Sequence, residues 1–154
     1  MNKITKKAED IVRDLRSFCR KIVIAGSIRR KDPSPNDIDI VCIPRDVNAI
    51  RYYFKRKGMV SGGEKQLKAE IDNISIDVWF TDERSWGAAL LHRTGPAGAA
   101  IWNRQLARQK GYKLNQYGLF NLKTGRQLLT PTEFHIYKAL GKPYRRPEDR
   151  GKPR

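Results

Sequence analysis

Apolar side chains recur with two different periods in the first half of the chain. Between Ile4 and Phe18 they recur every three or four residues, which predicts an amphipathic helix with a basic outer face. Elsewhere they alternate with polar side chains or form short β-branched runs, which predicts strands. These patterns predict helices at 3–18 and 47–57 and strands at 22–25, 37–43, 66–71 and 74–80. Asp72-Asn73, between the last two strands, is typical of a tight hairpin turn.

The second half changes to short elements with clear ends. A helix that begins near Ser85 breaks at Gly95-Pro96, and the next ends at Gly111, because glycine favours the position just after a helix. A final helix is predicted with Thr130 as its N-cap and Glu133 in its first turn. The pattern predicts helices at 85–94 and 97–110 and strands at 112–114, 118–121 and 126–129. The fold class is therefore α/β to about residue 81 and α+β after it.

The composition points to an anionic partner. The 154 residues include 32 Lys and Arg against 16 Asp and Glu, which gives a formal net charge of +16 and a pI of about 10.2. An excess this large opposes compaction unless an anion lies nearby, so it indicates nucleic acid, an anionic membrane or an acidic protein. It argues against a small-molecule enzyme with a neutral surface. Because no apolar run approaches the roughly 20 residues of a membrane span and no signal peptide is present, we expect a soluble, intracellular protein with no membrane partner.

Cysteine and tryptophan positions are interpreted as structural. Cys19 and Cys42 are too few for a disulfide scaffold or a zinc cluster, and their apolar neighbours predict two buried free thiols. Trp79, Trp86 and Trp102 lie on apolar faces of predicted elements, so we expect each in the core.

Three aspartates are the strongest sign of chemistry. Asp37 and Asp39 lie two residues apart on one predicted strand, so their side chains point to the same face and repel each other unless a cation lies between them. Asp77 interrupts another apolar strand, and the hairpin context can bring it alongside this pair. Three converging carboxylates suit Mg²⁺, which prefers oxygen ligands and commonly retains substrate phosphates. An isolated Asp-x-Asp, by contrast, is most often a solvated strand face.

A phosphate-binding pattern precedes these acids. Gly26-Ser27 ends a predicted strand, and Arg29 and Arg30 follow it. Glycine lets the backbone approach an anion, and a hydroxyl, nearby N–H groups and a guanidinium bind phosphate oxygens. Gly-Ser alone is weak evidence, but with Asp-x-Asp about ten residues on it predicts triphosphate groups beside metal ligands.

These motifs resemble those of the DNA polymerase beta family (family X) within the nucleotidyltransferase superfamily. Gly26-Ser27-Ile28-Arg29-Arg30 with Asp37-Ile38-Asp39 is similar to the palm signature of that family, and Ile76-Asp77-Val78 is similar to its third-acid strand. The resemblance covers about residues 7–150. It continues through a nucleotide-contacting turn, a C-terminal hallmark and a terminal segment, which correspond to Leu91–Pro96, Lys113–Phe120 and Leu140–Tyr144.

The resemblance implies a nucleotidyltransferase palm over residues 1–81, with a mixed sheet flanked by helices, and a C-terminal subdomain over residues 82–154 that contacts nucleotide and template. Asp37 and Asp39 would bridge two Mg²⁺ ions, for which Mn²⁺ can substitute, and Asp77 would hold the catalytic one. The residues implied to contact the nucleotide are Gly26, Ser27, Arg30, His92, Arg93 and Gly95.

The implied activity is DNA polymerisation for short-gap repair, by a monomer acting on gapped or primer–template DNA with nucleoside triphosphates. No acidic residue occurs between Glu83 and Glu133, so we expect this basic stretch to hold DNA. Arg104 matches an arginine that reaches the template strand in the family. The residues expected to contact DNA are Arg104, Arg108, Lys110 and Lys113.

Three departures from the family pattern leave alternatives open. Arg93 stands where the family usually has an aromatic residue, and Ala100 stands where many relatives have Asn. Because no segment of this sequence resembles the N-terminal lyase domain of the family, we expect a minimal polymerase without deoxyribose-phosphate lyase activity. Arg93, together with His92, whose counterpart in the family is often Tyr, permits a template-independent or ribonucleotide-adding transferase. From other classes, the alternatives are a small nucleotidyltransferase that modifies a protein or small molecule, and a DNA-binding module without activity.

Overall fold

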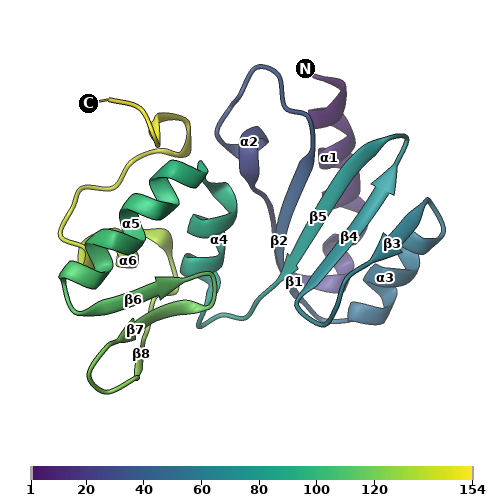
Figure 1. Ribbon diagram of the computed structural model, residues 1–154. Coiled ribbons are helices and arrows are strands. Elements are labelled where there is room, and N and C mark those ends of the chain that lie inside the picture. Colours follow the sequence, from purple (N-terminus) through teal and green to yellow (C-terminus); the bar gives the residue numbers. More distant parts are fainter. Residues whose placement is uncertain (1, 154) are drawn as a thin grey trace.

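The computed structural model describes residues 2–153 and arranges them around two separate sheets (Figure 1). The five-stranded sheet has the order β1-β2-β5-β4-β3, and the three-stranded sheet has the order β6-β7-β8. β2 runs parallel to β5 and the other neighbours are antiparallel, so the first sheet is mixed, as expected. The strands are β1 (Cys19–Ile24), β2 (Ile38–Pro44), β3 (Met59–Ser61), β4 (Gln66–Ile71), β5 (Ile74–Phe80), β6 (Tyr112–Asn115), β7 (Gly118–Asn121) and β8 (Gln127–Leu128).

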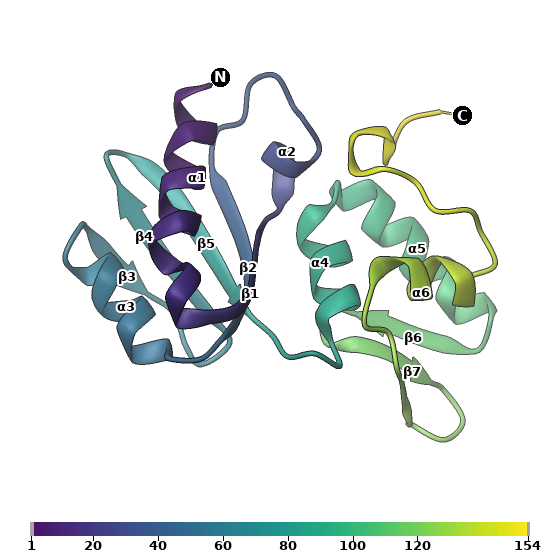
Figure 2. The same ribbon diagram turned by 180° about the vertical axis from the view of Figure 1, so that it is seen from behind.

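Helices pack on both faces of the five-stranded sheet. α1 and α3 lie against one face (Figure 2), and α4 contacts β2 from the other. The helices are α1 (Lys3–Leu15), α2 (Gly26–Arg29), α3 (Val47–Lys55), α4 (Trp86–Thr94), α5 (Ala97–Gln109) and α6 (Glu133–Ala139), with 3-10 helices at Arg16–Phe18 and Pro147–Asp149. Within residues 2–153, no helix is long and apolar enough to cross a membrane.

Side-chain alternation in β2 and β5 divides the first core into two layers. On β2, Ile40 joins the core beneath α1 and α3, whereas Val41 packs with Trp86 of α4. On β5, Val78 and Trp79 divide in the same way. The aspartates of these strands share the parity of Val41 and Trp79, so they lie on the face away from α1 and α3.

The second half has a core of its own and is joined to the first by a buried charge cluster. The hairpin of β6 and β7 packs with α4, α5 and α6. Arg29 of α2 donates to both carboxylate oxygens of Glu133 at 2.9 and 2.7 Å, and Arg150 donates to the same carboxylate at 2.6 Å. Because Glu133 lies in α6, this cluster fixes α2 against the second half.

Most of the predicted elements are confirmed. β4 and β5 have the predicted bounds, and Asp72 and Asn73 between them have φ of 52° and 65°, as a tight type I′ hairpin turn requires. Cys19 and Cys42 are both buried free thiols, as predicted. Three short elements were not predicted: the edge strand β3, the single turn α2 and the 3-10 helix Pro147–Asp149.

The prediction for Trp102 is wrong. Trp79 and Trp86 are buried, but 61% of Trp102 is exposed. The buried face of α5 runs through Asn103 and Ala107, which are four residues apart, and Trp102 lies outside this narrow stripe.

The predicted start of the last helix is also wrong. α6 begins at Glu133 with Thr132 as its N-cap, two residues after the predicted cap. Thr130 is buried instead, and its carbonyl oxygen accepts a hydrogen bond from the Gly87 amide at 3.1 Å. Glu133 is engaged by arginines and does not act in a capping box.

Candidate active site

The sheet register brings the three predicted acids to one place. Asp39 and Asp77 are direct partners in the parallel pairing of β2 with β5. Asp37 immediately precedes β2 and shares the parity of Asp39. Asp37 is exposed, whereas Asp39 and Asp77 are half-buried. The three carboxylates therefore lie on the same face of the sheet.

The pKa of Asp39 is affected by the other carboxylates of this cluster. Burial, followed by the charges of Asp37 and Asp77, raises the pKa of Asp39 to about 6, while Arg93 and Arg30 partly offset this effect. Ionised Asp39 is therefore held at an energetic cost that a cation would relieve, and the carboxylate donor set fits a hard divalent cation. Within residues 2–153, no three Asp, Glu, His or Cys side chains are already grouped closely enough to hold a metal ion.

Gly26 allows the start of α2 to lie against Asp39. Its φ is +62°, and a Cβ at this position would lie 2.2 Å from Asp39 Oδ2, so both the backbone and the carboxylate require glycine. The next residue, Ser27, has a buried hydroxyl for which residues 2–153 provide no hydrogen-bond partner. A buried hydroxyl in this position is a polar contact available to a ligand.

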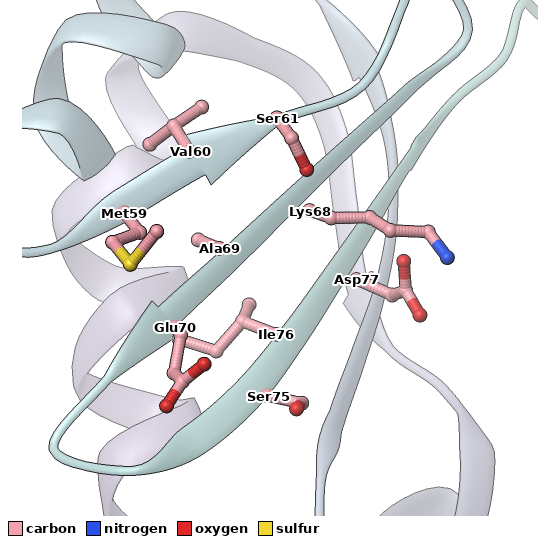
Figure 3. Close-up of a pocket in the computed structure, with 9 residues that line it drawn as sticks. All are labelled: Met59, Val60, Ser61, Lys68, Ala69, Glu70, Ser75, Ile76 and Asp77. Carbon is pink, nitrogen blue, oxygen red and sulfur yellow. The ribbon is translucent and has the colours of Figure 1, made fainter.

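Asp77 is held by a residue that the sequence patterns do not identify. Gln66 Nε2 donates to Asp77 Oδ1 at 2.8 Å. Gln66 lies on β4, two residues before Lys68, the register partner of Asp77. Figure 3 shows Lys68 and Asp77 extending from neighbouring strands along a groove of about 300 Å³ on the uncovered side of β3, β4 and β5. No motif marks Gln66, because the contact depends on strand pairing.

The two arginines after Ser27 reach toward the second half of the chain. Arg30 Nη1 donates to the Thr94 carbonyl oxygen at 2.6 Å. Arg29 donates to Thr94 Oγ1 at 2.8 Å as well as to Glu133. Arg29 thus serves as a bridge between the halves, whereas Arg30 is close enough to the acids to lower the pKa of Asp39.

His92 and Arg93 lie in the last turn of α4. Burial, followed by the charges of Arg93 and Arg104, lowers the pKa of His92, so its imidazole is neutral at physiological pH. The Arg93 guanidinium lies 4.6 Å from the ring centre of Trp79, and its Nη2 donates to Gln116 Oε1 at 3.4 Å. Arg93 Nε is buried, and no acceptor for it is found in residues 2–153.

Gly95 directly follows α4, and the residues predicted to contact DNA lie on and just after α5 and on β6, which come after it in the chain. Gly95 has φ of +66°, and a Cβ there would lie 3.2 Å from Arg30 Nη1. Arg104 shares a small cavity with His92. All four predicted DNA contacts are exposed: Arg104 and Arg108 on α5, Lys110 at its end, and Lys113 on β6.

Comparison with known proteins decides the family. Residues 89–151 match the family described as DNA polymerase beta thumb. Over 147 residues the chain is 30% identical to the repair DNA polymerase X of African swine fever virus (isolate Pig/Kenya/KEN-50/1950), a match that covers 88% of this chain and 84% of that protein. The chain belongs to family X of the DNA polymerases. This family X polymerase is also 26% identical, over 152 residues, to the DNA polymerase/3′-5′ exonuclease PolX of Bacillus subtilis, which covers 93% of this chain and 27% of that protein.

Solved structures confirm the predicted fold class of this polymerase. The ternary P/T complex of Leishmania infantum polymerase beta matches with a TM-score of 0.79 at 19% identity, covering 95% of this chain and 73% of that one. The ternary gap complex of the same protein matches with a TM-score of 0.78 at 18% identity, covering 96% and 67%. Family membership likewise confirms the predicted enzyme class, a metal-dependent DNA polymerase.

Proposed function

We propose that this polymerase extends a primer 3′-OH in short gaps during DNA repair, with nucleoside triphosphates as substrates and pyrophosphate as product. The observation that carries the proposal is the set of three carboxylates on one face of β2 and β5, beside the orphaned Ser27 hydroxyl. Residues 1–81 would form the catalytic palm, and residues 82–154 would contact nucleotide and template. We infer that the protein acts as a monomer on gapped or primer–template DNA.

The three aspartates supply the oxygen ligands for two Mg²⁺ ions, for which Mn²⁺ can substitute. When bound, the ions lower the pKa of the primer hydroxyl and stabilise the charge that develops on the phosphates. Asp37, Asp39 and Asp77 would hold these ions through their carboxylate oxygens, on the face that they share. Asp39 must be ionised to serve as a ligand, and a pKa of about 6 allows this near neutral pH.

The triphosphate binds at the loop and turn that face the acids. The glycine at position 26 keeps the backbone close, the Ser27 hydroxyl donates to a phosphate oxygen, and Arg30 supplies the guanidinium N–H groups that Thr94 does not use. His92, Arg93 and Gly95 lie where the sugar and base would follow. Because His92 is neutral, it can donate or accept a hydrogen bond without repelling the nearby arginines.

One observation favours a second candidate, addition of ribonucleotides. Arg93 replaces the bulky aromatic of the family pattern, and its guanidinium is drawn onto Trp79 and Gln116. Its buried Nε is a donor without an acceptor in residues 2–153, and a ribose 2′-OH offers such an acceptor. Weak discrimination between the two sugars is therefore expected.

Primer extension on one-nucleotide-gapped DNA with Mg²⁺ tests both candidates. We expect Asp77→Asn to reduce extension at least about a hundredfold, because a lost metal ligand removes several kcal/mol of transition-state stabilisation. Glu64→Gln is the matched control, since it neutralises an exposed acid outside the site. Extension by Asp77→Asn at the wild-type rate would contradict the proposal. The four ribonucleotides, compared with the four deoxynucleotides on the same primer, test the second candidate.

A further inference from the structure

A cleft beside α5 has no part in the proposed reaction. It has a volume of about 610 Å³ and lies between α5 and the C-terminal segment, residues 142–151. The cavity shared by His92 and Arg104 is a separate one, although Asn103 of α5 lines both. We call this space the α5 cleft.

An exposed tryptophan is the main apolar surface of the α5 cleft. Trp102 lines it and is 61% exposed, so its ring is not needed for packing. Pro96, Ala99 and Leu106 add apolar walls. The cleft is open beside Gly98, an exposed residue that lines it, because a Cβ there would meet no atom within 4 Å. A flat aromatic ring is therefore presented next to free space.

The charge of the α5 cleft is entirely positive. Lys142, Arg145 and Arg150 line it, and none of its lining residues is acidic. Arg150 is 4% exposed and donates through Nη1 to Glu133 and through Nε to the Arg145 carbonyl oxygen. Its Nη2 is buried, and residues 2–153 provide no acceptor for it. The cleft thus combines an aromatic surface with cations, one of which has an unused donor.

We propose that the α5 cleft binds one unpaired nucleotide of a DNA single strand, with the base stacked on Trp102 and the backbone phosphate facing Lys142 and Arg145. Every base has a flat face, so stacking on an exposed ring together with cationic contacts suits a single strand of any sequence. Pro96, which lines the cleft, directly follows Gly95 of the nucleotide-contacting turn, so a strand that leaves the polymerising site can reach it. An acidic peptide would contact the cations but would leave the ring without a partner.

Fluorescence anisotropy with three labelled DNA probes tests the proposal. The probes are a short oligothymidylate, a primer–template with a single-stranded 5′ template overhang, and the same duplex with blunt ends. We expect Trp102→Ala to weaken binding of the two single-stranded probes at least about fivefold, the lower end of what base–aromatic stacking contributes, and to leave the blunt duplex unchanged. Trp102→Phe, which keeps a ring, should retain most of the affinity.

Two further variants make the test specific. Gly98→Leu places a side chain in the open space beside Gly98 while keeping Trp102 and improving helix propensity, so it should reduce binding of the overhang as strongly as Trp102→Ala does. Tyr52→Ala removes an aromatic that is 63% exposed on α3, and should change nothing. The proposal is overturned if Trp102→Ala binds the overhang as tightly as wild type does, or if the substitution weakens binding of the blunt duplex to the same extent. It is also overturned if polyglutamate displaces the oligothymidylate from wild type but not from Trp102→Ala.

Extension of a one-nucleotide gap separates this inference from the proposed function. If Trp102→Ala fills the gap at the wild-type rate but loses the preference for the overhang, the result supports single-strand binding in the α5 cleft. It also shows that the catalytic site of the variant is intact. Failure of wild type to extend any primer would instead contradict the proposed function, while the anisotropy result would still decide the cleft.

Discussion

Several residues at the site carry a charge or a polar atom that has no compensating partner among the described residues. Asp39 is held near two other carboxylates, and burial adds to the cost of its charge. The Ser27 hydroxyl and Arg93 Nε are buried and have no hydrogen-bond partner in residues 2–153. Each such group lowers the stability of the unliganded protein by about 1–3 kcal/mol. Such costs gather at functional sites because a ligand relieves them on binding.

Gln66 is the positioning residue for Asp77, and this role predicts a specific defect. Gln66→Leu keeps similar bulk but removes the hydrogen bond to Asp77 Oδ1, so the carboxylate is free to rotate. Hydrogen bonds to charged groups contribute about 1.5–3 kcal/mol, so we expect extension at limiting Mg²⁺ to fall about tenfold or more. The Mg²⁺ concentration for half-maximal rate should rise, and the loss should shrink at high Mg²⁺. Ser75→Ala, an exposed change on β5, is the control, and a Mg²⁺ dependence equal to wild type would exclude the role.

Individual site residues differed in how far the sequence could predict them. Asp37, Asp39 and the Gly26-Ser27 turn are recognisable because their spacing along the chain already encodes their shared face and their approach to an anion. Gln66 carries no such signal, since its contact arises from the pairing of β4 with β5. The partners of Arg29 could not be predicted either, because Glu133 lies 104 positions away.

At the scale of elements, the predictions succeeded where one face of an element is covered. β2 and β5 are buried on the α1 and α3 side over their whole length, so alternation identifies them and the face on which their acids lie. Only a narrow stripe of α5 is buried. The apolar pattern of this helix therefore cannot show which of its apolar residues, for example Trp102, are left exposed to solvent. The start of α6 was misplaced because Glu133 resembles a capping residue but is held by arginines.

The contact between α2 and α6 predicts a pH-dependent stability. Burial by itself raises the pKa of Glu133, but hydrogen bonds from Arg29 and Arg150 outweigh it and hold the pKa below its usual range. A depressed carboxylate pKa stabilises the fold above the unfolded value of about 4.5, and this stability is lost as the pH falls through the lower folded value. Glu133→Gln should therefore destabilise the protein by about 3 kcal/mol at pH 7 and by progressively less below pH 4.5.

Urea denaturation at pH 7, 5 and 3.5 measures this difference. Glu148→Gln is the matched control, because its carboxylate pairs with Lys31 at the surface and should contribute little at any of these pH values. A difference between wild type and Glu133→Gln that stays constant from pH 7 to pH 3.5 would show that the ionised carboxylate is not what joins α2 to α6.

At the scale of the whole molecule, the net charge of +16 is unevenly placed. The stretch from residue 84 to residue 132 contains no acid, and it includes α5 and the small sheet. The first half holds the three aspartates that face this stretch across the site. A duplex that contacts this stretch would therefore meet basic side chains without acidic ones from the same stretch, and cations bound to the aspartates would reduce the repulsion between these carboxylates and DNA phosphates.

The position of the basic residues, and not their number, should determine how duplex binding depends on salt. Each phosphate contact that is removed makes the slope of log K against log salt concentration less steep by about 1, so Arg104→Ala with Arg108→Ala should reduce the slope by about 2. Arg16→Ala with Lys55→Ala is the matched control, because it removes the same charge from exposed positions in the 3-10 helix after α1 and in α3, on the covered face of the sheet. Anisotropy titrations with blunt duplex from 50 to 200 mM salt give both slopes. If the two double variants share one slope, binding reflects total charge, and α5 is not the DNA-binding surface.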